Sequence, residues 1–141
     1  MIEALSAMGS VFTDPYLLGL IFATTVLGVI IGVLPGLGAT TGAALLLPFT
    51  LTMEPVQAIA VLSTIYVSAT FAGSITAILI NTPGTSAAAA TTFDGYPLAQ
   101  QGEAGRALGI AVVSSTVGGV FSVIVLCIAA PLLARVAYEF R

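Results

Sequence analysis

Three long stretches without a charged residue constrain this chain more than any other feature of its sequence. Two of them, 15–53 and 55–93, hold 39 residues each, and a third, 107–134, holds 28. A helix needs about 20 apolar residues to cross the hydrocarbon core of a bilayer. Charged residues make up 6% of the chain, against about 25% in ordinary soluble domains. The sequence therefore predicts an all-α fold, that of a polytopic integral membrane protein.

The first two stretches are each too long for one straight span, and each contains a run of helix breakers. These runs are Pro35–Gly38 and Asn81–Gly84. Proline removes a backbone donor and clashes with the preceding turn, and glycine adds conformational freedom, so both runs should interrupt a helix. We therefore expect broken or re-entrant helices, with spans at roughly 16–34, 39–53, 56–80 and 107–134. The polar segment 94–106 is expected to be a solvent-exposed loop.

The few charged side chains leave the orientation in the membrane open. Arg106 would place the 94–106 loop on the cytoplasmic side by the positive-inside rule, whereas Arg135 and Arg141 argue the opposite way. Asp94 precedes Gly95, and Asp-Gly is a strong turn signal, so the simplest interpretation of Asp94 is a turn residue.

Several classes of chemistry are excluded by residues that the chain lacks. It has no lysine, so it cannot contain a Walker A motif, and no basic patch for nucleic acid. It has no histidine, and Cys127 is its single cysteine. A serine or threonine nucleophile would have no base to activate it. We therefore predict no enzyme activity, no catalytic residue, no metal site and no cofactor.

The two breaks are the best candidates for a binding site. A helix that restarts within a membrane offers unpaired amides and a partial positive charge, which form an anion site without lysine or arginine. Hydroxyl residues follow each break directly. The predicted substrate-binding residues are Gly36, Gly38, Thr40, Thr41, Gly84, Thr85 and Ser86. Carbonyls at the end of the preceding helix suit a coupling ion, for which the predicted residues are Asn81, Thr82 and Pro83.

An alternative stays open at this point, because glycine, proline, serine and threonine also occur in membrane helices for packing alone. Glycines four residues apart, such as Gly28 and Gly32, let helices approach closely. On this interpretation the breaks serve packing, and the chain is a non-transporting structural or assembly subunit. A passive channel is a further alternative.

Three stretches around the breaks carry a family resemblance, namely 32–48, 73–84 and 94–109. Together they resemble the large membrane subunit of the bacterial tripartite tricarboxylate transporters, the TctA family, over about residues 15–134. The chain departs from the family pattern at Ala39, where many members have proline. The resemblance implies that residues 1–141 form the N-terminal part of a longer transmembrane domain. It predicts that a second half carries its own broken segment, and that this piece alone does not transport.

The resemblance also implies a function. The large subunit is the translocating component of a secondary transporter in the bacterial inner membrane, driven by a gradient of Na⁺ or H⁺. Its expected partners are a small membrane subunit and a periplasmic solute-binding protein. Its expected substrates are di- and tricarboxylates similar to citrate.

Overall fold

The computed structural model describes residues 13–139, apart from the side chains at 131, 132 and 134–139. Within that part the protein is all-α and contains no strand, so the predicted fold class is confirmed. Arg135 and Arg141, which bear on orientation, lie outside the described side chains. The elements in chain order are α2 (Pro15–Val33), α3 (Ala39–Thr50), α4 (Pro55–Ile80), the 3₁₀ turn η1 (Ser86–Ala88), α5 (Thr91–Leu98), the π-helical turn η2 (Ala99–Glu103) and α6 (Ala104–Glu139).

The two well-packed spans begin at prolines. Pro15 and Pro55 occupy the first turn of α2 and α4, where a missing amide hydrogen leaves no helical hydrogen bond unmade. At the start of α2, the Asp14 carboxylate accepts hydrogen bonds from the amides of Tyr16 (2.9 Å) and Leu17 (3.4 Å). This capping satisfies two amides that would otherwise lack a partner.

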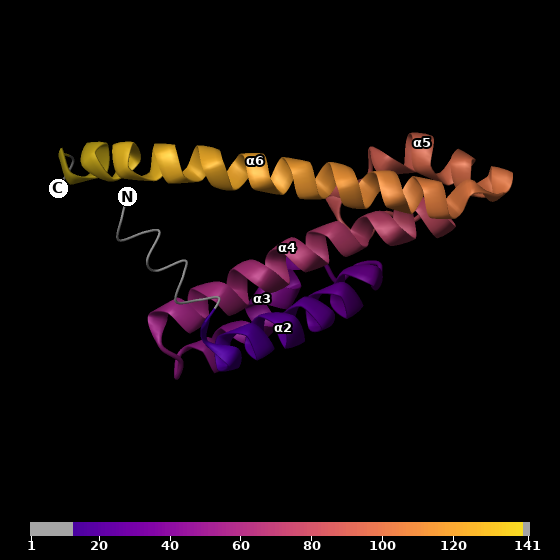
Figure 1. The fold of residues 1–141 in the computed structure, drawn as a ribbon. Helices are drawn as coiled ribbons and strands as arrows, with labels where there is room; N and C mark the ends of the chain where they lie inside the picture. The colour runs from indigo at the N-terminus through magenta and orange to yellow at the C-terminus, as the bar shows by residue number, and fades with distance from the viewer. Residues whose placement is uncertain (1–12, 140–141) are drawn as a thin grey trace.

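Helices α2 and α4 run side by side in the same direction, and α3 folds back beside them (Figure 1). Gly28 of α2 lies against Ile65 and Ser68, and Gly32, one turn later, lies against Ala69. Because both contacts advance along α2 and α4 together, the two helices are parallel. The short helix α3 therefore returns the chain across part of the membrane depth.

Helix α4 is the centre of the packed region. Ile65 and Ile78 are its largest fully buried side chains, and small residues such as Ala69 and Ala72 are buried beside them. Among the described residues, three helical stretches are long and apolar enough to cross a membrane: Pro15–Val33, Pro55–Ile80 and a third within Thr91–Ala130. Helix α3, with 12 residues, is apolar but shorter.

The segment 94–106 is exposed at most of its residues, but it is not the loop that we expected. It is mostly helical, and its chain reversal between α5 and α6 falls on Gly102, with φ of +84°. Asp94 lies in the first turn of α5 and not in a tight turn. Gly95 explains why the Asp-Gly signal was misleading, because a Cβ there would lie 2.7 Å from Cγ1 of Ile78. This glycine allows α5 to approach α4 closely instead of forming a turn.

Candidate substrate-binding site

The first break separates α2 from α3 at residues 34–38. Leu34 adopts an extended conformation after the last turn of α2, and Gly36 has φ of +93°, which only glycine adopts without strain. Gly38 occupies the N-cap position of α3 and has no side chain to accept a hydrogen bond. The first amides of α3, at Ala39 and Thr40, are therefore left without a capping acceptor.

The second break follows α4. Asn81 has a left-handed conformation with φ of 55°, and the amides of Asn81 and Thr82 both donate to the Thr76 carbonyl. Pro83 cannot extend the helix. The Gly84 amide then donates to the Gly73 carbonyl at 3.2 Å, which brings the chain back alongside α4.

The two breaks meet at one place in the fold. Gly84 packs against the Gly32 carbonyl of α2, and a Cβ at position 84 would lie 2.9 Å from the Cα of Gly73. A Cβ at position 73 would lie 2.8 Å from the Thr85 amide nitrogen. Glycines from α2, α4 and the second break therefore allow the contact that holds the two breaks together.

A cavity of about 230 Å³ lies where the breaks meet, and we call it the break pocket. Its lining residues are Gly36, Gly38, Ala39, Thr40, Tyr66, Thr70, Gly84, Thr85, Ser86 and Ala87. Six of the seven residues predicted to bind substrate are among them. Thr41 is exposed and lies outside the lining. The residues predicted for a coupling ion, Asn81, Thr82 and Pro83, are also exposed and line none of the four cavities described for this part of the chain.

The break pocket includes two residues of α4 that sequence reasoning missed, Tyr66 and Thr70. They are one turn apart, so they share a face of the helix. Two polar side chains spaced in this way within an apolar span could have drawn attention to this face. They flank the middle of α4, at about 2 and 4 Å from its midpoint at 1.5 Å per residue. The break pocket therefore lies level with the centre of a membrane-spanning helix.

The polar groups of the break pocket are neutral. No charged side chain lines it, so its polar groups are the first amides of α3 and the hydroxyls of Thr40, Tyr66, Thr70, Thr85 and Ser86. The Thr70 hydroxyl donates to its own helix, to the Tyr66 carbonyl at 2.7 Å. Thr85 Oγ1 is the one buried side-chain polar atom without a hydrogen-bond partner in the described part of the chain. Buried hydroxyls are nearly always paired, so this atom has an unfilled hydrogen-bonding capacity.

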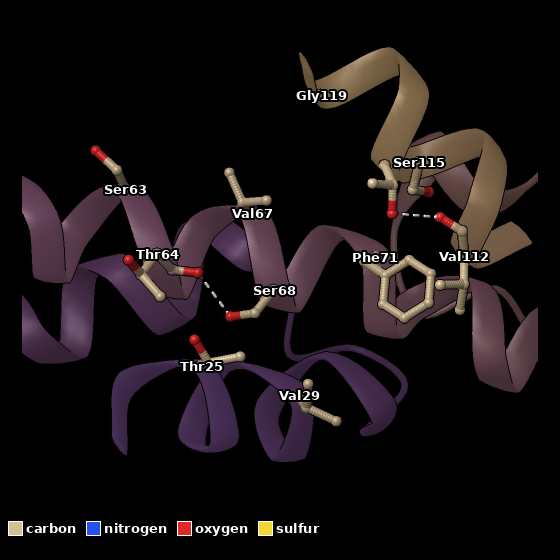
Figure 2. A pocket seen from close by; sticks show the side chains of 11 residues that line it. Thr25, Val29, Ser63, Thr64, Val67, Ser68, Phe71, Val112, Ser115 and Gly119 are labelled. Atoms are coloured by element: carbon tan, nitrogen blue, oxygen red, sulfur yellow. Dashed lines mark hydrogen bonds between the residues drawn. The ribbon is translucent and has the colours of Figure 1, made fainter. Parts of the chain in front are cut away.

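A larger groove of about 620 Å³ lies between α2, α4 and α6. Figure 2 shows it from close by, with Thr25 and Val29 of α2 below α4, and Ser115 and Gly119 of α6 on the far side. Three of its hydroxyls are bonded within their own helices: Thr25 to Ile21 (2.7 Å), Ser68 to Thr64 (2.6 Å) and Thr116 to Val112 (2.8 Å). No helix terminus opens into this groove. Its chemistry is that of helix packing, and the break pocket is the better ligand site despite its smaller volume.

Comparison with known proteins gives two matches. The model described as "Tripartite tricarboxylate transporter TctA family" matches residues 18–141. A relative from Agrobacterium vitis, described as an uncharacterized 52.8 kDa protein in TAR-I ttuC' 3'region, is 49% identical over 119 residues. That alignment covers 84% of this chain and 24% of the relative, so the chain spans about a quarter of the relative's length. No solved structure matches the chain.

Proposed function

Because the chain belongs to the TctA family of tripartite tricarboxylate transporters, as its motifs predict, we propose that it forms part of the translocation path for a small organic carboxylate. The proposed activity is secondary transport in the bacterial inner membrane, driven by an ion gradient. The proposed partners are a small membrane subunit and a periplasmic binding protein that delivers the substrate. The break pocket is the observation that carries this proposal.

The break pocket suits an anion because donors converge on it from separate segments. The start of α3 contributes free amides and the positive end of a helix dipole, equivalent to roughly half a unit charge. Hydroxyls from the second break supply further donors. A site of this kind stabilises a carboxylate through oriented dipoles without a fixed positive charge. A transport site must also release its ligand, and neutral donors bind an anion less tightly than a buried arginine would.

The position of the break pocket agrees with a transport role. Secondary transporters place substrate near the bilayer midplane, where discontinuous helices meet. Tyr66 and Thr70 put the break pocket level with the middle of α4. Its volume of about 230 Å³ is below the range of about 300–1,000 Å³ typical of sites for drug-sized ligands, which suits a small acid.

The sharpest test replaces Thr85 by valine, which keeps the shape of the side chain and removes its hydroxyl. Thr85 Oγ1 has no partner in the described protein. Its removal should therefore not destabilise the fold, because an unsatisfied buried hydroxyl is itself unfavourable by about 1–3 kcal/mol. We expect Thr85→Val and Thr40→Val each to lower kcat/KM for uptake of radiolabelled citrate or another di- or tricarboxylate by about two- to tenfold, the equivalent of one hydrogen bond.

Thr92→Val is the matched control, because the Thr92 hydroxyl already donates to the Ala89 carbonyl at 2.7 Å and lines none of the four cavities. It should leave uptake unchanged. Membrane abundance is measured for all three variants. Normal uptake in both Thr40→Val and Thr85→Val would favour a structural subunit whose breaks serve packing. Carboxylate flux that equilibrates but never accumulates under an imposed ion gradient would favour a passive channel.

A further inference from the structure

A second cavity lies beside the break pocket along α4, and we call it the adjoining cavity. Its volume is about 400 Å³. Tyr66, Thr70 and Ala87 line both cavities, so the two share a common border. The break pocket alone is smaller than the range of about 300–1,000 Å³ typical of sites for drug-sized ligands, whereas the two cavities together fall within that range. An acid too long for the break pocket alone therefore has space next to it.

The chain that follows the second break passes from one cavity to the other at Ala87. Thr85 and Ser86 line the break pocket but not the adjoining cavity, Ala87 lines both, and Ala88 lines the adjoining cavity but not the break pocket. Ala87 is exposed, whereas Ala88 is only 2% exposed. Position 87 is therefore the place in this segment where the size of one side chain determines how open the border is, and alanine leaves it open.

The adjoining cavity contains hydroxyls that the fold itself does not use. Ser74 of α4, Thr91 of α5 and Ser115 of α6 line it, and none of these three side chains is hydrogen-bonded within the described residues. Ser74 lies one turn of α4 beyond Thr70, about 6 Å farther along the helix axis. Hydroxyls from three different helices are thus available to the outer end of an acid that extends out of the break pocket.

We infer that Ala87 is a specificity-determining residue, which sets the length of the acid that the site accepts. One carboxylate of the acid binds the amides and hydroxyls of the break pocket. The rest of a longer acid passes Ala87 and reaches the hydroxyls of the adjoining cavity. A larger side chain at position 87 closes the border and restricts the site to short acids. The inference rests on the proposed function, because it takes the break pocket as the site of the first carboxylate.

The direct test is equilibrium binding of ¹⁴C-labelled malonate, succinate, glutarate and adipate, which differ only in their number of methylene groups. The protein is purified with its native membrane partner but without the periplasmic binding protein, so that no other component selects acids by length. Ala87→Leu should leave malonate affinity within about twofold of the unmodified protein. It should weaken adipate binding by at least about tenfold, because each methylene excluded from a cavity costs about fourfold in affinity.

Ala89→Leu is the matched control for Ala87→Leu. Ala89 is also exposed, lies two positions farther along the chain, and lines none of the four cavities described for this part of the chain. It adds the same side chain without approaching the border between the two cavities. The affinities for all of these acids should be unchanged.

Ser115→Ala tests the other end of the site without filling any space. Ser115 is exposed on α6 and makes no hydrogen bond within the described residues, so its hydroxyl is not needed for folding. We expect adipate binding to weaken by about two- to tenfold, the equivalent of one hydrogen bond. Malonate, which stays within the break pocket, should bind as tightly as before.

The inference is overturned if Ala87→Leu changes the affinity for malonate and adipate by the same factor, or changes neither. It is also overturned if the unmodified protein binds malonate but not adipate. Thr85→Val separates this inference from the proposed function, because Thr85 lies in the break pocket and its loss should weaken every acid alike. Normal binding of all the acids by Thr85→Val would contradict the break pocket as the site of the first carboxylate. A uniform loss in Thr85→Val, with no dependence on length in Ala87→Leu, would contradict the role of Ala87 alone.

Discussion

Helices α2 and α4 differ from α6 in packing although all three are apolar. In their most apolar stretches, 22% of the residues of α2 and 33% of those of α4 are buried, whereas none is buried in the corresponding stretch within Thr91–Ala130. Glycines of α2 meet the backbone of α4, but Gly118 and Gly119 of α6 have no neighbour within 4 Å of an added Cβ. Among the described residues, α2 and α4 therefore form one packed unit, and α6 meets it at one end (Figure 1).

The difference in packing between α2–α4 and α6 bears on where the substrate is proposed to bind. The break pocket belongs to the packed unit of α2 and α4, where contacts between glycines hold the two chain breaks against each other. A separate cavity of about 320 Å³ lies where α6 still meets α4 and α5, before α6 and α4 separate toward the C-terminal end of α6. The substrate is thus proposed to bind within the closely packed part of the molecule.

Among the substitutions that test this difference in packing, Gly32→Ala should have the largest effect on stability. The new Cβ would overlap the Ala69 carbonyl and lie 2.7 Å from the Ala69 Cα, and a backbone cannot rotate away as a side chain can. We expect the free energy of unfolding in detergent to fall by about 1–3 kcal/mol. Gly119→Ala in α6 is the matched control, and the gain in helix propensity should raise stability by up to about 1 kcal/mol. Equal losses of stability in Gly32→Ala and Gly119→Ala would contradict the difference in packing between α2 and α6.

A smaller effect is expected within the break pocket itself. Gly36 and Gly38 both line it, and an added Cβ meets nothing within 4 Å at either position. Only Gly36 has a positive φ. Gly36→Ala should lower the free energy of unfolding by about 1–2 kcal/mol through backbone strain, whereas Gly38→Ala should be neutral. Chemical denaturation of the two variants side by side measures the difference, and a neutral Gly36→Ala would show that the break relaxes freely.

The smallest effect compares two threonines that donate to their own helices. Thr24 of α2 is buried and donates to the Leu20 carbonyl at 2.8 Å, whereas Thr116 of α6 is exposed and donates to the Val112 carbonyl at 2.8 Å. Valine at position 24 should lower stability by about 0.6 kcal/mol, the average for such hydrogen bonds in a membrane protein. Valine at position 116 should have no measurable effect. A larger loss at position 116 would place that hydroxyl in a contact outside this chain.

The chemistry of short sequence segments predicts much of the fold and part of the candidate site. The length of the uncharged stretches predicts the membrane class, and Pro35 and Pro83 with their glycines predict where the helices break. The hydroxyl residues that follow each break could also be predicted, because they are neighbours of the break in the sequence. The segment 94–106 was misjudged because Gly95 serves a helix contact there, which no local turn preference reveals.

Only the tertiary structure decided that the two breaks meet and that Tyr66 and Thr70 complete the break pocket. These relations join residues far apart in the chain, and they depend on the rotation of each helix about its own axis. In a soluble protein the apolar stripe of a helix reveals that rotation. The small polar residues of α4 are spread around its circumference, so its sequence carries no such stripe. Its packed face is determined by where Gly28, Gly32 and Gly84 allow their neighbours to approach.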